Sequence, residues 1–188
     1  LRAIGVNAVL GQAGGPVCAA EMRLPPVAVW TAIRVQDSLA KGVSYFMAEL
    51  QRLKQVVDAA TTASADGGEG EDDARRGRRT TPTVLYLLDE ILHGTNSAER
   101  QIAAQRIIAF LVAEGAIGAV STHDLALADS PALTPVARLV HFRETIRRED
   151  GRLVMSFDYR LRPGIATSTN ALALMELIGL SGALRNPA

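Results

Sequence analysis

Two short apolar runs in the middle of the chain each end abruptly in polar residues. TVLYLL ends at the acidic pair Asp89-Glu90, and AIGAVST ends at His123-Asp124. Continuous apolar runs of this length are typical of strands that are buried on both faces of a parallel sheet. We therefore expect two buried strands whose carboxyl ends carry charged side chains.

The segment between these runs has the spacing of an amphipathic helix over about residues 98–113. Asn96, followed three residues later by Glu99, resembles a capping box, and Gly115 suits a C-terminal cap. The predicted apolar stripe consists of Ala103, Ile107, Phe110 and Leu111. Strand, helix and strand at this spacing predict a βαβ unit with two neighbouring parallel strands.

The upstream part of the chain predicts further elements of the same kind. Residues 1–15 resemble the end of a helix followed by a glycine-rich turn, and VWTAIRV, rich in β-branched residues, predicts a strand. A second helix is expected to begin near Ser44, with apolar residues three or four positions apart. Those apolar positions are Phe46, Met47, Leu50, Leu53 and Val57.

Residues 61–80, TTASADGGEGEDDARRGRRT, differ in kind from their surroundings. They have almost no apolar content, and an acidic block precedes a basic one. Such a segment cannot bury enough apolar surface to offset the entropy of ordering it. We predict a disordered surface loop inserted between the second helix and the next strand. Contact of its basic half with phosphates is the less favoured alternative.

The C-terminal part of the chain predicts a hairpin. ARLVHFRETIRREDGRLVMSFDYRL alternates between apolar and polar residues, and Asp150-Gly151 is a hairpin turn signal. The later strand is expected to present Leu153, Met155, Phe157, Tyr159 and Leu161 on one side. Residues 170–178 predict a short helix. The fold class is therefore α/β, a parallel sheet flanked by helices with an added antiparallel hairpin.

Composition narrows the class of protein. The 188 residues are 48% hydrophobic and 21% charged with a formal net charge of +0, so no global field favours nucleic acid or an anionic membrane. No apolar run reaches the length of a membrane span. A single cysteine, Cys18, excludes an internal disulfide, indicates a reducing, cytoplasmic compartment, and is expected to be buried. Because the chain begins with Leu1 in mid-pattern, we interpret it as a piece of a longer protein.

The charged strand ends suggest phosphate chemistry. Ligands of open parallel sheets bind outside the carboxyl ends of the strands, where Asp89-Glu90 and Thr122-His123-Asp124 would meet. Asp89 would hold Mg²⁺, Glu90 would orient or deprotonate a water, and His123 would contact a terminal phosphate, as in the Walker B strand of an ATPase. Each feature alone has a plainer explanation, because strands often end in acidic turn residues and a histidine is more often a cap or core residue.

The joint pattern resembles the ATPase domain of the MutS family of DNA mismatch repair proteins. LLDEILHGTNSAERQIAAQRIIAFLVAEGAIGAVSTHDLALA is similar to the family's Asp-Glu, turn, helix and Ser-Thr-His strand end. IRVQDSLAKGVSYFMAELQRLKQVV and LRPGIATSTNALALMELIGL resemble two further family segments. The resemblance implies a P-loop NTPase core of the ABC type over residues 1–188, the 61–80 insert excepted, with ATP and Mg²⁺ as cofactors.

The resemblance also implies roles for individual residues. Asp89 matches the magnesium-associated acid, Glu90 the catalytic carboxylate and His123 the switch histidine near the γ-phosphate. Ser44 matches the serine offered to the partner's nucleotide across a dimer interface, although it also suits a helix cap. The remaining matches are Gln36 and Asp37 in a water- or metal-contacting loop, and Thr95, Asn96 and Ser97 in the interface turn. A homodimer with two ATP molecules at its interface is implied, with DNA bound by other domains.

The chain also departs from the family pattern. The phosphate-binding loop G-x-x-x-x-G-K-[ST] is absent, and LRAIGVN resembles the helix that follows it, so the loop is expected upstream. We expect the 188-residue chain alone to bind ATP poorly and to hydrolyse it negligibly. His93 stands where the family commonly has an arginine, so the chain departs from the family pattern at this point of the implied interface.

Two other hypotheses remain open. One is an ATPase of the wider ABC class without a mismatch role; however, AKGVSYFMAEL stands where that class has Leu-Ser-Gly-Gly-Gln. The other is a non-catalytic dimerisation domain, which the missing phosphate loop allows and which the combination of Asp89, Glu90 and His123 argues against.

Overall fold

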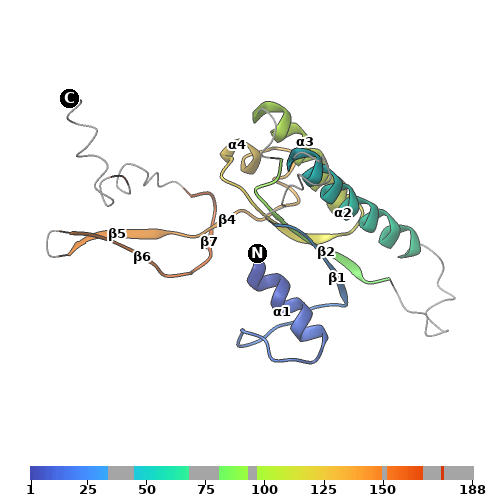
Figure 1. The fold of residues 1–188 in the computed structure, drawn as a ribbon, viewed down its shortest axis with the longest axis horizontal. Coiled ribbons are helices and arrows are strands. Elements are labelled where there is room, and N and C mark those ends of the chain that lie inside the picture. The colour runs from blue at the N-terminus through green and yellow to red at the C-terminus, as the bar shows by residue number, and fades with distance from the viewer. Residues whose placement is uncertain (34–44, 68–80, 93–96, 150–151, 167–174, 176–188) are drawn as a thin grey trace. The chain divides into compact units, whose positions relative to one another are not determined.

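The computed structural model describes residues 1–33, 45–67, 81–92, 97–149, 152–166 and 175 (Figure 1). The chain divides into two units, Leu1–Val136 and Ala137–Ala188. The first unit holds the sheet that the sequence predicts. Among the described helices, none combines the length and apolar composition needed to cross a membrane.

The first unit is built on three parallel strands in the order β1-β2-β3. These are β1 (Val27–Ala32), β2 (Thr83–Asp89) and β3 (Ile117–Ser121). Five consecutive residues of the central strand β2 are buried, as the apolar run predicts. The expected burial of β3 is wrong, because β3 lies at the edge of this sheet and its residues are exposed or half-buried. The βαβ unit is confirmed, since α3 (Ser97–Ala113) connects the parallel pair β2 and β3.

Helices cover both faces of this sheet (Figure 1). On one face, α2 (Tyr45–Gly67), α3 and the short α4 (Leu125–Ala128) pack against alternate residues of β2. On the opposite face, α1 (Arg2–Gln12) packs through Ala8 against Leu85 and Leu87. A Cβ on Gly5 would lie 2.9 Å from Leu87 Cδ1, so this glycine lets α1 approach the sheet closely.

Helix α2 corrects part of the predicted loop at 61–80. The helix continues through Gly67, and the hydroxyls of Thr61 and Thr62 donate to the carbonyls of Val57 and Asp58. Extending a helix that earlier packing has already started costs far less than starting one, which explains how it continues through TTASA. The rest of the predicted loop, 68–80, lies outside the described residues.

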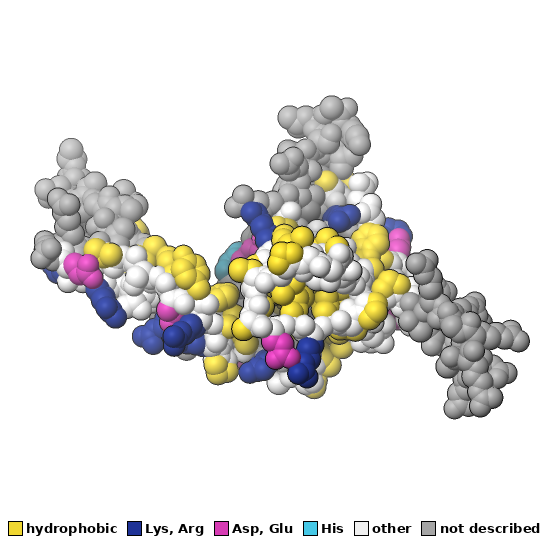
Figure 2. All heavy atoms as spheres, turned by 90° about the horizontal axis from the view of Figure 1, so that it is seen from below, with side chains coloured by type: hydrophobic (Ala, Val, Ile, Leu, Met, Phe, Trp, Pro, Cys, Tyr) yellow, Lys and Arg dark blue, Asp and Glu magenta, His cyan; other side chains and the backbone are white. Residues whose placement is uncertain are grey.

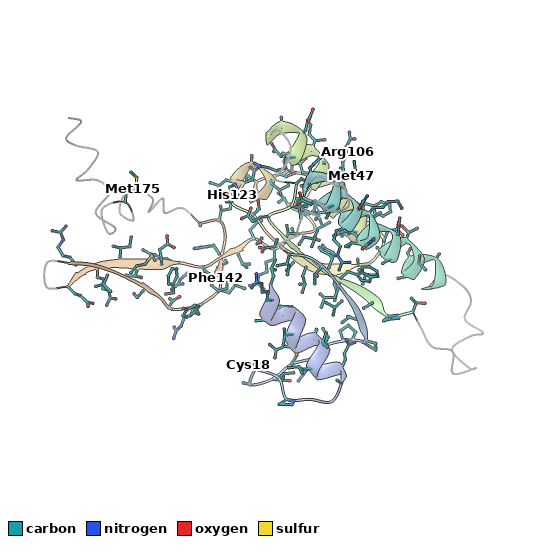
Figure 3. All side chains as sticks on the ribbon, in the orientation of Figure 1. Cys18, Met47, Arg106, His123, Phe142 and Met175 are labelled. Atoms are coloured by element: carbon teal, nitrogen blue, oxygen red, sulfur yellow. The ribbon has the colours of Figure 1, made fainter. Side chains whose placement is uncertain are left out.

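Most of each predicted stripe packs in the core, but one residue of each stripe, Met47 in α2 and Phe110 in α3, lies outside it. Met47 is 47% exposed and points away from the sheet (Figure 3), whereas Val56 is fully buried. In α3, Phe110 is 38% exposed, whereas Ala104 and Ile108 are buried with Leu111. A residue at the edge of an apolar stripe is left outside the contact when the helix docks through the centre of that stripe.

Two local expectations have opposite outcomes. Gly115 ends α3 at φ 73°, and Ala116 N–H donates to Leu111 O, so the predicted cap is confirmed. Cys18 is exposed in the loop after α1 (Figure 3), contrary to the expected burial, because its neighbours form no helix or strand that could cover it.

The described residues of the second unit form two small antiparallel pairs. β5 (Glu144–Glu149) and β6 (Arg152–Phe157) form the predicted hairpin, and β4 (Val140–His141) pairs with β7 (Arg162–Pro163). The predicted strand through Leu161 is wrong, because β6 ends at Phe157 and Tyr159, at φ 55°, turns the chain. Of the predicted helix 170–178, only Met175 is described, and it is helical.

Candidate functional site

The candidate site forms where β2 and β3 end. Asp89 and Ser121 are the last residues of these strands and are direct neighbours in the parallel register. The Ser121 hydroxyl donates a hydrogen bond to Asp89 Oδ1. The pairing fixes one carboxylate oxygen of Asp89 beside a hydroxyl at the carboxyl edge of the sheet.

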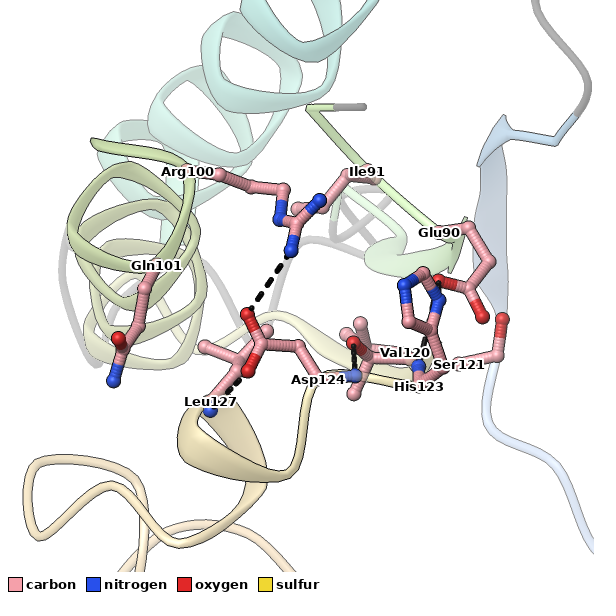
Figure 4. Close-up of a pocket in the computed structure, with 10 residues that line it drawn as sticks. Glu90, Ile91, Arg100, Gln101, Val120, Ser121, His123, Asp124 and Leu127 are labelled. Atoms are coloured by element: carbon pink, nitrogen blue, oxygen red, sulfur yellow. Dashed lines mark hydrogen bonds and ion pairs between the residues drawn. The ribbon is translucent and has the colours of Figure 1, made fainter. Parts of the chain in front are cut away.

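Glu90 and His123 meet one step beyond these strand ends (Figure 4). Glu90 N–H donates to Ser121 O at 3.1 Å, which carries the parallel pairing one residue past β2. Glu90 Oε2 lies 2.7 Å from His123 Nδ1 and accepts the His123 backbone N–H at 3.4 Å. The side chains are 36% and 64% exposed, so solvent screens their attraction while both remain accessible to a ligand.

A tight turn with positive φ angles begins at Glu90, the second residue of the acidic pair. Glu90 has φ 51° and Leu92 has φ 64°, in the region that L-residues other than glycine seldom adopt. Burial of Ile91 and Leu92 in the core holds the turn. Leu92 N–H donates to Glu49 Oε1 of α2 at 2.6 Å, so a buried carboxylate also supports it. This backbone shape turns the Glu90 side chain toward His123 instead of into the helix–sheet core.

Asp124 has a structural task beside this pair. Its Oδ1 accepts the N–H groups of Ala126 and Leu127 at 3.1 and 3.4 Å, which caps α4. Its Oδ2 lies 3.4 Å from Arg100 Nη2, with both side chains at most 20% exposed. Asp124 therefore anchors the β3–α4 connection that carries His123.

A small pocket lies between these elements, bounded by β2, β3, α3 and α4 (Figure 4). Glu90 and His123 line it on one side, and Arg100 and Asp124 line it on another. The remaining lining residues are Ile91, Gln101, Val120, Ser121, Thr122 and Leu127. The pocket thus presents both a carboxylate–imidazole pair and a guanidinium near the strand ends.

The oxygen atoms at this edge of the sheet are suitable ligands for a hard divalent cation that also binds a phosphate group. No group of three or more His, Cys, Asp or Glu side chains that could hold a metal exists among the described residues. Mg²⁺ does not need such a cage, because it commonly binds one or two protein oxygens and takes the rest from water and phosphates. Asp89 and Ser121 offer a carboxylate and a hydroxyl oxygen side by side.

The structure brings together the three residues on which the predicted site depends, Asp89, Glu90 and His123. Ser97 is the first residue of α3. The other predicted site residues lie outside the described part of the chain, and they are Gln36, Asp37, Ser44, Thr95 and Asn96.

Three polar residues near the site were not predicted: Ser121, Arg100 and Glu49. Ser121 could have been found, because parallel pairing of the two apolar runs places a hydroxyl beside Asp89. Glu49 also had a signal, because it is the glutamate of the Ser/Thr-Phe-Met-x-Glu helix start in the segment that resembles the MutS family. Arg100 gives no such signal, since a charged residue in an amphipathic helix is normally solvated. Their contacts depend on how α3 and α2 dock on the sheet.

The chain was compared with known proteins, and no protein-family model matches it. It is 31% identical over 186 residues to a protein of Natronomonas pharaonis named DNA mismatch repair protein MutS, covering 98% of this chain and 19% of that protein. A protein of that name from Exiguobacterium sp. gives the same identity and coverage. DNA mismatch repair protein MutS 2 of Haloarcula marismortui is 30% identical over 182 residues, which is 96% of this chain and 17% of that protein.

The aligned segment is nearly this entire chain, yet the chain spans only about a fifth of the length of these curated relatives. The similarity therefore covers both the strand ends that carry Asp89, Glu90 and His123 and the hairpin unit that follows them. Across nearly its whole length, the chain is a distant homologue of the DNA mismatch repair protein MutS.

Proposed function

We propose that this chain carries the hydrolytic part of an ATPase site in a MutS-like DNA repair protein. The observation that supports this most directly is the Glu90–His123 pair, with Oε2 and Nδ1 2.7 Å apart, beside Asp89 at the ends of two parallel strands. Such strand ends are where open α/β sheets bind their ligands. Homology to MutS proteins over the same residues supports the assignment.

In this proposal each side chain has a separate task. Glu90 orients the attacking water and accepts its proton, while His123 reports the terminal phosphate and steadies the Glu90 carboxylate when that phosphate is absent. Asp89, held by Ser121, would bind Mg²⁺, directly or through water. When bound, Mg²⁺ neutralises charge that develops on the phosphates. Asp124 and Arg100 fix the loop on which His123 stands.

The wider assembly is part of the same proposal. Ser44, Gln36 and Asp37 would complete nucleotide contacts, and the turn formed by Thr95, Asn96 and Ser97 would contact a second copy in a homodimer. DNA would bind through other parts of the gene product, and the bound nucleotide would change how those parts are arranged. The protein would act in the cytoplasm. In the view of Figure 2, acidic and basic side chains of the described residues lie interspersed, and with a net charge of +0 no global field favours binding of DNA to this chain.

The decisive experiment substitutes Glu90→Gln in the complete gene product. We expect kcat for ATP hydrolysis to fall by about 100-fold or more, because the amide cannot take a proton from water, while ATP still binds. Steady-state hydrolysis and equilibrium ATP binding are measured together. Glu114→Gln, which removes an acid at the far end of α3, is the matched control and should leave both quantities unchanged.

Three outcomes separate the hypotheses. Loss of kcat with retained ATP binding supports the ATPase assignment. Unchanged kcat in Glu90→Gln contradicts the role of Glu90. A complete gene product that neither binds nor hydrolyses ATP would instead favour a non-catalytic dimerisation domain.

A further inference from the structure

A buried carboxylate lies under the candidate site without contacting the pocket. Glu49, in the second turn of α2, is 2% exposed, and the only other buried polar residue in the described part of the chain is Ser130. Glu49 Oε1 accepts Leu92 N–H at 2.6 Å. Its Oε2 has no hydrogen-bond partner among the described residues. Burying a carboxylate with one oxygen unpaired is costly, whereas leucine or methionine would pack there without that cost.

The bond that Glu49 makes is at a strained point of the backbone. Leu92 ends the left-handed turn that begins at Glu90, with φ values of 64° and 51°. Such backbone conformations persist only where surrounding contacts over-determine them. Here the turn is held at both ends, by Ser121 O on Glu90 N–H and by Glu49 on Leu92 N–H. Without the second bond, only the burial of Ile91 and Leu92 opposes relaxation of this end of the turn toward ordinary backbone angles.

We infer that Glu49 is a positioning residue that holds the Glu90 carboxylate in its working direction by fixing the turn from Glu90 to Leu92. The inference rests on the proposed ATPase function. In the proposed mechanism, Glu49 contacts neither the attacking water nor the nucleotide. It ties the beginning of α2 to the end of β2, so that the direction of Glu90 depends on the position of that helix.

The test compares three substitutions in the complete gene product. Glu49→Ala removes the acceptor, Glu49→Asp keeps the charge but is one methylene too short, and Glu49→Gln keeps an oxygen at the same reach. We expect kcat to fall by about 10- to 100-fold in the first two, because small misplacements of a catalytic group cost this much. ATP affinity should be unchanged, and Glu49→Gln should keep most of kcat.

Two controls on the same helix exclude a merely structural effect. Leu53→Ala leaves a cavity at a side chain that is 2% exposed, so it lowers stability without touching Leu92 N–H. Asp58→Asn removes an exposed acid that pairs with Lys54. Both should keep the kcat of the folded protein. If Leu53→Ala lowers kcat as much as Glu49→Ala, or if Glu49→Gln is as slow as Glu49→Ala, the inference is wrong.

Amide hydrogen exchange at Leu92 tests the inference independently of hydrolysis. We expect exchange to become at least about tenfold faster in Glu49→Ala and Glu49→Asp and to stay slow in Glu49→Gln, because the lost bond lets the turn open locally. Unchanged exchange in all three variants overturns the role of Glu49. If the unsubstituted protein does not hydrolyse ATP, the proposed function fails, and the exchange rates still decide whether Glu49 holds the turn.

Discussion

Asp158 is an exposed residue whose pKa is changed strongly by one neighbour, Arg162. Arg162 Nη1 lies 3.2 Å from Asp158 Oδ1, and Nη2 bonds the second oxygen, so the guanidinium grips the carboxylate with two bonds. Hydrogen bonding from Arg162, with help from the Arg160 N–H, holds the Asp158 pKa well below its ordinary value of 3.8. The same bond raises the pKa of Arg162.

This pair predicts an acid-dependent contribution to the stability of the second unit. Because the Asp158 pKa is lower in the folded chain than in the unfolded one, the contribution is fully present above about pH 4 and is lost as pH falls toward the folded value. Carboxyl NMR titration should place the Asp158 pKa well below that of an unpaired aspartate. Arg162→Met should return it toward the ordinary value; an Asp158 titration that is the same in both proteins would contradict the pairing.

At the same scale, sequence reasoning found some site residues and missed others for a physical reason. Asp89, Glu90 and His123 follow apolar strands directly, so their placement at one sheet edge follows from strand pairing alone. Glu49 is the glutamate of the family-like Ser/Thr-Phe-Met-x-Glu helix start, but its role was missed because its charge predicts solvation, and only the docking of α2 puts it under Leu92. Cys18 was expected inside because of its residue type, and its loop leaves it exposed.

At the scale of elements, the contact between β2 and β3 depends on one residue without a side chain. Gly118 pairs with Tyr86 in the parallel register. A Cβ at Gly118 would lie 2.2 Å from the Tyr86 carbonyl oxygen and 2.3 Å from its ring. Backbone cannot move aside as a flexible side-chain tip can. The spacing of the strands that carry Asp89 and His123 therefore relies on this glycine.

Gly118→Ala should be strongly destabilising. We expect the free energy of unfolding to fall by about 3 kcal/mol, because the added methyl forces β3 away from β2. Gly115→Ala is the matched control: nothing lies within 4 Å of its Cβ position, and only its positive φ opposes the change. That control should cost about 1 kcal/mol. Urea unfolding of both variants measures the difference, and equal losses would show that the close contact at Gly118 is not decisive.

The elements themselves were predicted better than their faces and ends. The hydrophobic pattern predicted β2, β3 and α3, because a short apolar run and an amphipathic helix leave different patterns. The same pattern placed Met47 at one edge of the α2 stripe and left out Val56 at the other edge, and the docking angle of the helix decides which edge is buried. The end of β6 was missed because alternation continues beyond Phe157, whereas the Asp158–Arg162 pair and Tyr159 turn the chain.

At the scale of the whole molecule, the described strand ends supply groups for hydrolysis, but the sequence contains no G-x-x-x-x-G-K-[ST] phosphate loop. That loop supplies the backbone N–H groups and the lysine that bind the β- and γ-phosphates. We therefore expect the isolated 188-residue chain to bind ATP at least about 100-fold more weakly than the complete gene product, a difference of about 3 kcal/mol. Isothermal titration of both proteins with ATP measures it.

A folding control is needed for that comparison. Circular dichroism of the isolated chain should show a cooperative thermal transition, because the sheet core of the first unit is formed within residues 1–136. Tight ATP binding by a folded isolated chain would mean that its own residues hold the phosphates by another route.

The pairing of β1 with β2 joins Val27 to Thr83, residues that are far apart along the chain. Contacts between residues so far apart in the sequence form late, because much of the intervening chain must first lose conformational entropy. This pairing should therefore limit the folding rate of the first unit. The length of the connection has a much smaller effect on equilibrium stability. Doubling a flexible connection adds only about 0.6 kcal/mol of closure entropy. The polar run 68–80, which lies within this connection, can therefore change length during evolution while the register that sets Asp89 beside Ser121 is preserved.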